Sequence, residues 1–250
     1  MTGWEEISDW YDKKMGNEGD LWHRSLIDPA LIKLVGSVDR KSILDLGCGN
    51  GYLSRKFARE GGKVTAIDSS AGMLKNARAR DSEEPLSIEY LQLDSAHLVT
   101  LKDDTFDIVF ANMTLMDIED AEGAIRESSR VLKKRGKLIA SISHPCFDNG
   151  TYSGWLVEKT IYKETVYRRI TKYRTLFSEE VPWRISSQEM RNTLSYHRPL
   201  SWYAKVLSSA GLSITALEEP EPSKEFLGGE ANGACFLEVP LHLVFEAKKL

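Results

Sequence analysis

The sequence is poor in cysteine and has no long apolar run. Its three cysteines, Cys48, Cys146 and Cys235, lie far apart in the 250-residue chain. They form neither a disulfide framework nor a zinc-binding pattern, so we expect a reducing compartment and no metal site. Nowhere do about eighteen apolar residues follow one another, and the sequence therefore predicts no membrane span.

The start of the chain also lacks the features of a secretory signal. The stretch MTGWEEISDW carries three acids before any apolar run. A signal peptide instead begins with basic residues followed by an apolar stretch. Together with the scarce cysteines, this predicts a cytoplasmic protein.

An excess of positive charge is missing as well. The net charge is −4, which gives no global attraction for the phosphates of a nucleic acid. A content of 42% hydrophobic and 28% charged residues is ordinary for a globular protein. A chain of 250 residues can bury one substantial core but is short for two full domains.

What the sequence does contain is an alternation of short apolar runs and helical patterns. The runs SILDL, KVTAI, IEYLQL, FDIVFA and GKLIASI have the composition of buried strands. Between them, residues 52–60, 70–80 and 119–132 place apolar residues at helical spacing. This alternation predicts an α/β fold with a parallel sheet covered by helices.

The segments on either side of this core follow other patterns. We expect helices at 3–14 and 21–35, then, after the core, a helix at 201–209 and strands at 213–219 and 241–247. The stretch EEPEPSKEFLGGEANG, residues 218–233, is expected to be a surface loop.

Residues 148–198 interrupt the rhythm, because they are rich in aromatic and basic residues and show no long helical face. We interpret them as an insertion of short antiparallel strands. The chain is thus expected to form one domain, 1–250. Its expected parts are a helical cap (1–40), a core (41–147), an inserted lid (148–198) and a C-terminal completion of the sheet (199–250).

Glycines occupy every second position directly after the first predicted strand. Gly47, Gly49 and Gly51 precede a predicted helix, where backbone amides can approach a polar or anionic ligand group. The nicotinamide-dinucleotide fingerprint would need its third glycine at position 52, which is Tyr52. A purely structural tight turn is the alternative.

Two aspartates end the next two predicted strands. Asp68 ends the second strand, where a carboxylate can accept both hydroxyls of a ribose, and Asp94 ends the third. Either could instead be a turn or helix-capping residue. Ligands of open α/β sheets bind at the carboxyl edge of the strands, so the coincidence of three such features there favours a ligand site.

The core motifs resemble those of a known family. LDLGCGNG, VTAIDSSAGML, LQLDSAHL, FDIVFANMTLMDI and RVLKKRGKLIASI are similar, in order and spacing, to class I S-adenosylmethionine-dependent methyltransferases. The likeness is to their type 11 group, which includes the ubiquinone and menaquinone methylases. It implies a mostly parallel, Rossmann-like sheet of seven strands, with the last strand antiparallel.

The resemblance also implies the cofactor, S-adenosylmethionine, with S-adenosylhomocysteine as product, and a set of binding residues. Those expected around the methionine, ribose and adenine are Tyr11, Asp45, Gly47, Gly49, Gly51, Asp68, Ser69, Met73, Asp94 and Ser95. Asn112 and Met113 are expected near the reacting methyl group. Asp45 would hold the loop in shape, and Tyr11 would lie over the cofactor.

Methyl transfer needs a general base only when the acceptor must first lose a proton, and histidine is the natural base at neutral pH. His144 follows the fifth strand in SISHPCF, His197 lies before a helix in SYHRPLSW, and His23 lies in an N-terminal helix. These are the candidate catalytic residues. Each has a structural alternative as a partner of the backbone.

The predicted acceptor is a small molecule, with oxygen, nitrogen or carbon as the nucleophile. An RNA acceptor is the first alternative, because EKTIYKETVYRRITKYRTLF interleaves bases with aromatics, as single-stranded RNA binding requires. The same stretch fits a solvated hairpin over a small pocket. A module that binds S-adenosylmethionine without transferring its methyl group is the second alternative.

Overall fold

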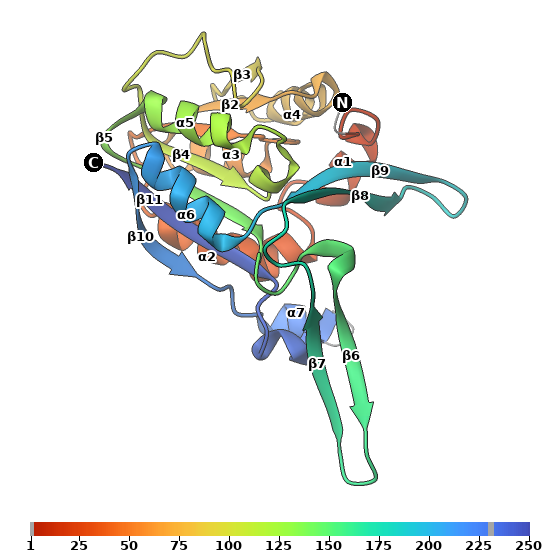
Figure 1. Cartoon of the computed structure of the whole chain (residues 1–250). Coiled ribbons are helices and arrows are strands. Elements are labelled where there is room, and N and C mark those ends of the chain that lie inside the picture. The colour runs from red at the N-terminus through yellow and green to blue at the C-terminus, as the bar shows by residue number, and fades with distance from the viewer. Residues whose placement is uncertain (1–2, 230–232) are drawn as a thin grey trace.

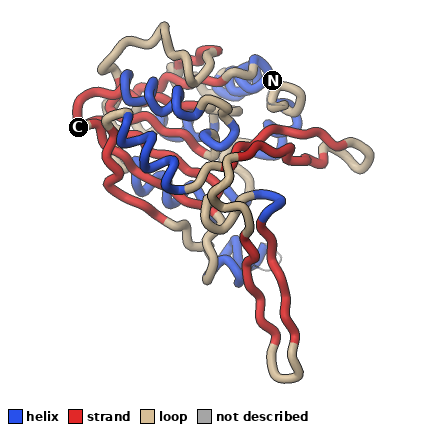
Figure 2. Tube along the Cα trace, in the orientation of Figure 1, coloured by secondary structure: helices blue, strands red, loops and turns tan. Residues whose placement is uncertain are grey.

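The computed structural model describes residues 3–229 and 233–250. Its centre is a seven-stranded sheet with the order β10-β11-β5-β4-β1-β2-β3 (Figures 1 and 2). The strands are β1 (Ser42–Leu46), β2 (Lys63–Asp68), β3 (Glu89–Gln92), β4 (Phe106–Asn112), β5 (Leu132–Ser143), β10 (Leu212–Glu218) and β11 (His242–Lys249). The first five run parallel, and β11 lies antiparallel between β5 and β10. The predicted α/β fold with an antiparallel last strand is confirmed.

Helices cover both faces of this sheet. They are α2 (Asp28–Val35), α3 (Tyr52–Arg59), α4 (Ala71–Asp81), α5 (Ala121–Val131) and α6 (Leu200–Ser209). Leu44, Val109 and Leu138 share one apolar core with α5 and α6, whereas Ile43 and Ile108 share the other with α2, α3 and α4. Successive strand residues point to opposite faces, so each apolar run supplies both cores.

The N-terminal segment is helical, but less uniformly than predicted. The first helix, α1, is limited to Ser8–Met15. The second begins near the expected residue, where the Asp20 side chain accepts the His23 amide hydrogen at 3.1 Å. It then passes through a π-helical turn, His23–Ile27, before α2. Such a widened turn leaves no mark in an apolar pattern of helical spacing.

The insertion contains two antiparallel hairpins, as expected. The first pairs β6 (Ser153–Lys159) with β7 (Glu164–Ile170), and the second pairs β8 (Phe177–Arg184) with β9 (Met190–His197). The first hairpin projects away from the sheet, whereas the second runs beside the N-terminal helix α1 (Figure 1). The two hairpins therefore have different neighbours, although the sequence presents them as one segment.

The expectation of a loop at 218–233 is wrong for its middle part. Residues 224–229 form a short helix, α7 (Lys224–Gly229), and residues 230–232 lie outside the described residues. Phe226 on this helix is buried against Trp22 and Phe236, with ring centroids 5.0 and 5.2 Å away. A helix of six residues is too short to show a period, and its apolar partners come from distant parts of the chain.

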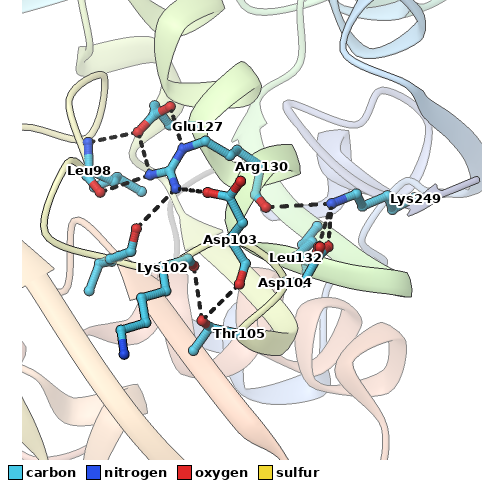
Figure 3. Close-up of polar contacts among 10 residues, drawn as sticks. Leu98, Lys102, Asp103, Asp104, Thr105, Glu127, Arg130, Leu132 and Lys249 are labelled. Carbon is cyan, nitrogen blue, oxygen red and sulfur yellow. Dashed lines mark hydrogen bonds and ion pairs between the residues drawn. The ribbon is translucent and has the colours of Figure 1, made fainter.

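Polar contacts attach the loop between β3 and β4 to α5 and β11, at the edge of the sheet opposite the glycine turn (Figure 3). The Arg130 guanidinium of α5 donates to the Leu98 carbonyl at 2.8 Å and pairs with Asp103. Nearby, Lys249 Nζ of β11 donates to the Leu132 carbonyl at 2.6 Å and to Asp104 at 2.9 Å. These contacts connect the loop, α5 and the end of β11 at the edge of the sheet away from the glycine turn.

Candidate active site

The glycine turn between β1 and α3 depends on backbone conformations that glycine adopts readily. Gly47, Gly49 and Gly51 have φ values of 74°, 53° and 74°. At Gly47 space is also short, because an added Cβ would lie 2.3 Å from Cγ2 of Thr114, which follows β4. Glycine at position 47 therefore lets the β4 end approach the turn closely.

Two aspartates, the half-buried Asp68 and the buried Asp45, hold the turn in place. Asp68, at the end of β2, accepts the amide hydrogens of Gly49 and Ser70, each at 2.9 Å. Burial raises its pKa. Asp45 accepts a 2.5 Å hydrogen bond from the Ser54 hydroxyl, and burial raises its pKa to about 7. Asp45 thus ties β1 to α3.

A cavity of about 420 Å³ opens at the carboxyl edge of the sheet beside this turn. It is lined by nine of the twelve residues predicted to bind the cofactor, namely Tyr11, Gly47, Asp68, Ser69, Met73, Asp94, Ser95, Asn112 and Met113. Asp45, Gly49 and Gly51 are the other three. The structure therefore brings together residues from α1 and from the ends of four strands around one space.

At the end of β4, a buried polar network orients Asn112. Its Nδ2 donates to Asp28 Oδ1 and to the Tyr52 hydroxyl oxygen, both at 2.9 Å. Its Oδ1 accepts from the Ser141 hydroxyl at 2.5 Å. Burial raises the pKa of Asp28. Since every polar atom of the amide has a partner, Asn112 presents a fixed surface to the cavity.

Met113, the next residue, adopts a left-handed backbone conformation with a φ of 51°. Its amide is held by the carbonyl and hydroxyl oxygens of Ser141, at 3.1 and 2.8 Å. A non-glycine residue in this region of φ and ψ is uncommon and is often found at functional sites. This conformation changes the direction of the chain after β4, where Thr114 lies close to Gly47.

The chain is similar to known methyltransferases. The Methyltransferase domain family matches residues 44–140. An S-adenosylmethionine-dependent methyltransferase structure from Mesorhizobium loti superimposes with a TM-score of 0.71 at 26% identity, covering 88% of this chain and 96% of that one. Residues 44–140 thus match a methyltransferase domain, and the predicted resemblance to class I S-adenosylmethionine-dependent methyltransferases is confirmed. The structure from Mesorhizobium loti depends, by its name, on S-adenosylmethionine, which supports the predicted cofactor.

Curated relatives resemble part of this chain. A demethylmenaquinone methyltransferase of Renibacterium salmoninarum is 32% identical over 60% of this chain and 56% of its own length. A ubiquinone biosynthesis O-methyltransferase of Xanthomonas oryzae is 36% identical over 40% of this chain and 41% of its own length. The chain spans about half the length of the curated relatives it matches.

The two acids predicted at the ribose and adenine ends differ in their surroundings. Asp94 accepts the Ala96 amide hydrogen at 2.9 Å and contacts the His97 ring at 3.1 Å. Burial alone would raise its pKa, but these two partners lower it. Asp94 therefore stays ionised at the cavity wall, opposite the more deeply buried Asp68.

None of the three candidate histidines is among the residues that line this cavity. His144 contacts Glu219 at 3.0 Å and accepts the Cys146 amide hydrogen, and burial lowers its pKa. His197 stacks on Phe177 and faces a separate cavity of about 200 Å³. His23 pairs with Asp20 at 2.7 Å. Each ring thus has partners within the fold.

Part of the cavity wall was not predicted from the sequence. Trp4 and the turn that follows β4 complete the lining with Thr114, Asp117, Ile118, Glu119 and Asp120. The turn could have been found, because it continues directly from a strand that ends at the ligand-binding edge. Trp4 carried no such signal. It is held in place by Trp183 of β8, whose ring centroid lies 5.7 Å away.

Among the described residues, no group of three or more His, Cys, Asp or Glu side chains is placed to hold a metal ion. Within the same residues, no helix is both long and apolar enough to cross a bilayer.

Proposed function

We propose that this protein transfers the methyl group of S-adenosylmethionine to a small-molecule acceptor by in-line displacement. The observation that carries the proposal is the cavity beside the glycine turn at the carboxyl edge, lined by Gly47, Asp68, Asp94 and Met113. Its volume of about 420 Å³ lies in the range of small-ligand sites. When bound, S-adenosylmethionine supplies a methyl group on a positively charged sulfur.

The residues of the cavity wall would hold this ligand by their chemistry. Asp68 would accept hydrogen bonds from the ribose hydroxyls, using the lone pairs that its two amide contacts leave free. Ser69, Met73, Asp94 and Ser95 would meet the adenine, and the glycine turn with Asp45 behind it would face the methionine part. Asn112 and Met113 would lie near the methyl group, and Tyr11 would cover the ligand from α1.

Alignment in a site shielded from water is the main requirement of such a displacement, and it can supply several kcal/mol. The second hairpin supports this shielding, because Trp183 contacts Trp4 and Trp10 of the N-terminal cap. We therefore propose that the cap (1–40) and the lid (148–198) together complete the acceptor pocket of a single domain. The histidines at 23, 144 and 197 have no part in this proposal.

The alternative of an RNA acceptor rests on the basic and aromatic residues of the first hairpin. Some of these bases have partners, since Lys159 pairs with Glu164 and Arg168 with Asp148. The relatives act on acceptors such as demethylmenaquinone, according to their names. Both observations favour the small molecule.

A transfer experiment tests the proposal. The protein is incubated with S-adenosylmethionine labelled in its methyl group and with a cell extract, and label is counted in small molecules, RNA and protein. Label in the small-molecule pool is expected, and label in RNA instead would support the alternative. A titration with S-adenosylmethionine runs in parallel, so that binding without transfer to any pool would identify a binding module.

A further inference from the structure

Five carboxylates line the candidate active site, and four of them are accounted for. Asp68 accepts two backbone amides, and Asp94 accepts the Ala96 amide and contacts His97. Asp120 caps α5 by accepting the Gly123 amide hydrogen at 2.8 Å. Glu119 is exposed. The fifth, Asp117, has no such role.

Asp117 ends the short 3-10 helix Leu115–Asp117, which directly follows the turn at Met113. Asp117 lines the cavity and is half-buried. Within the described chain, the side chain placed to hydrogen-bond to it is that of Trp4, which opposes the effect of burial. Burial prevails and raises the pKa of Asp117 to about 8.

Asp117 is also firmly positioned. The guanidinium of Arg198, which follows β9, donates to the carbonyls of Leu115, Ile118 and Glu119, at 3.2, 2.6 and 2.8 Å. Arg198 is buried and clamps the turn from the side of the lid. The Arg198 guanidinium therefore binds the backbone of the turn that carries Asp117.

Among the ionisable groups in this part of the cavity, Asp117 is the one suited to accept a proton. The hydroxyls of Tyr11 on α1, Tyr196 on β9 and Tyr203 on α6 lie within its electrostatic reach, and burial raises the pKa of each. They remain neutral at physiological pH. Glu119 and Asp120 lie on the same turn and Arg198 contacts its backbone, but burial is the main influence on the pKa of Asp117.

We propose that Asp117 is the general base of the transfer reaction and takes the proton of a hydroxyl or ammonium group on the acceptor. This inference rests on the proposed function. In the step, an acceptor oxygen forms its bond to the methyl carbon as its proton passes to the Asp117 carboxylate. An ammonium nitrogen first gives its proton to the carboxylate and then forms the bond with the electron pair that this frees. The bond from the methyl carbon to sulfur breaks, and its electron pair remains on the sulfur, which loses its positive charge.

The ionisation of Asp117 should depend on the charge of the bound methyl donor. A cation in the same cavity favours the ionised form of a nearby carboxyl, so bound S-adenosylmethionine lowers the pKa of Asp117. S-adenosylhomocysteine has a neutral sulfur and lowers it less. Asp117 thus becomes a competent base when the donor is present. An acceptor whose nucleophile is a carbon without an exchangeable proton would not need it.

The first test measures this ionisation directly and needs no acceptor. Protein labelled with carboxyl-¹³C aspartate is titrated by NMR alone, with S-adenosylmethionine and with S-adenosylhomocysteine. We expect a resonance that titrates near pH 8 in the free protein and is missing from Asp117→Asn. S-adenosylmethionine should move its midpoint to lower pH by more than S-adenosylhomocysteine does. Equal midpoints with the two ligands would overturn the proposal.

The second test measures transfer to the labelled small-molecule pool. Asp117→Asn should lower kcat by about 10²–10⁴-fold and should abolish its rise with pH, while the dissociation constant for S-adenosylhomocysteine stays within about twofold. Asp39→Asn, on the exposed surface, is the control. An increase in KM with unchanged kcat would show an acceptor-binding role instead and would refute the base. Asp117→Ser replaces Asp117→Asn should that variant not fold.

The two proposals fail differently. A wild-type protein that labels no pool refutes the proposed function. Failure of the Asp117 role alone leaves wild-type transfer intact, with an unchanged kcat in Asp117→Asn or equal NMR midpoints with the two ligands.

Discussion

Trp183 of the second hairpin packs against Trp4 of the N-terminal segment, with ring centroids 5.7 Å apart. Trp4 is part of the cavity wall, so a residue of the insertion supports the candidate active site through one aromatic contact. Removing the Trp183 ring should loosen Trp4 by about 0.5–1.5 kcal/mol, the scale of an aromatic pair. We expect Trp183→Ala to weaken S-adenosylhomocysteine binding by up to about tenfold, measured by calorimetry.

Trp155→Ala is the matched control, because Trp155 lies on the first hairpin and contacts Phe236 rather than the cavity. It should lower the free energy of unfolding without changing the affinity. Equal affinities for the Trp183 variant and the wild type would show that the lid does not support the site.

A second prediction concerns the close approach at the glycine turn. Gly47 and Gly211 have nearly the same φ, 74° and 76°, but an added Cβ meets Thr114 at 2.3 Å in the first case and nothing within 4 Å in the second. Gly211→Ala therefore isolates backbone strain, about 1–2 kcal/mol. Gly47→Ala adds overpacking of about 1–3 kcal/mol. Chemical denaturation measures both, and equal losses of stability would contradict the tight contact.

A third prediction tests the assignment of Asp68 to the ribose. Asp68→Ala should weaken S-adenosylmethionine binding by about 1–3 kcal/mol, the scale of hydrogen bonds to a charged group. Asp68→Asn keeps the shape of the side chain, and its affinity for S-adenosylmethionine should lie between those of Asp68→Ala and the wild type. Both are measured by titration, with Asp39→Asn as the surface control. A dissociation constant unchanged by Asp68→Ala would remove Asp68 from the site.

The first hairpin allows a fourth prediction, which separates a small acceptor from RNA. Val157 pairs with Val166, so residues 158–165 can be replaced by Asn-Gly, which forms a tight hairpin turn. The removed tip includes Ile161 and Tyr162, both about nine-tenths exposed. We expect unchanged transfer to the small-molecule pool. Loss of transfer with intact S-adenosylmethionine binding would instead assign this hairpin to acceptor recognition.

A fifth prediction concerns acid stability. His242 is buried next to Trp22, its Nδ1 has no hydrogen-bond partner among residues 3–229 and 233–250, and burial lowers its pKa to about 3. The unfolded chain binds a proton at this residue below about pH 6.5, whereas the folded chain does not until about pH 3. The contribution of His242 to stability is therefore present above pH 6.5 and is lost as the pH falls toward 3.

His242→Phe removes this titration. The unfolding free energy of the wild type relative to the variant should fall by about 2 kcal/mol between pH 7.5 and pH 5. Urea denaturation at the two pH values measures it. The comparison also cancels the opposite effect of Asp45, whose raised pKa of about 7 makes the protein more stable as the pH falls toward 4. Parallel pH profiles would contradict the buried neutral histidine.

The strands of the sheet could be predicted from the sequence because each is one short, continuous apolar stretch. Each apolar run, such as Phe106–Asn112, is continuous and bounded by turn residues. The ligand-binding edge followed from topology, since parallel strands place their carboxyl ends together. Residues directly after those ends, such as Asp68 and Asn112, could therefore be placed in one cavity.

What could not be predicted depends on contacts between distant parts of the chain. The partners of Trp4 and Phe226 are Trp183 and Trp22, and no spacing rule connects such pairs. Asp117 was missed because one acid in a short turn has no period. Its surroundings, rather than its neighbours in sequence, distinguish it from the exposed Glu119 beside it.

The position of β11 has a consequence for the order in which the molecule can assemble. β5 pairs with β4 on one side and with β11 on the other. β11 is synthesised only after residues 144–241, which include both hairpins. During synthesis, one edge of β5 therefore stays without its partner, and closing this long loop is slow. We infer that the sheet is completed only after residues 242–249 leave the ribosome, and that until then β5 is the strand most in need of protection from aggregation.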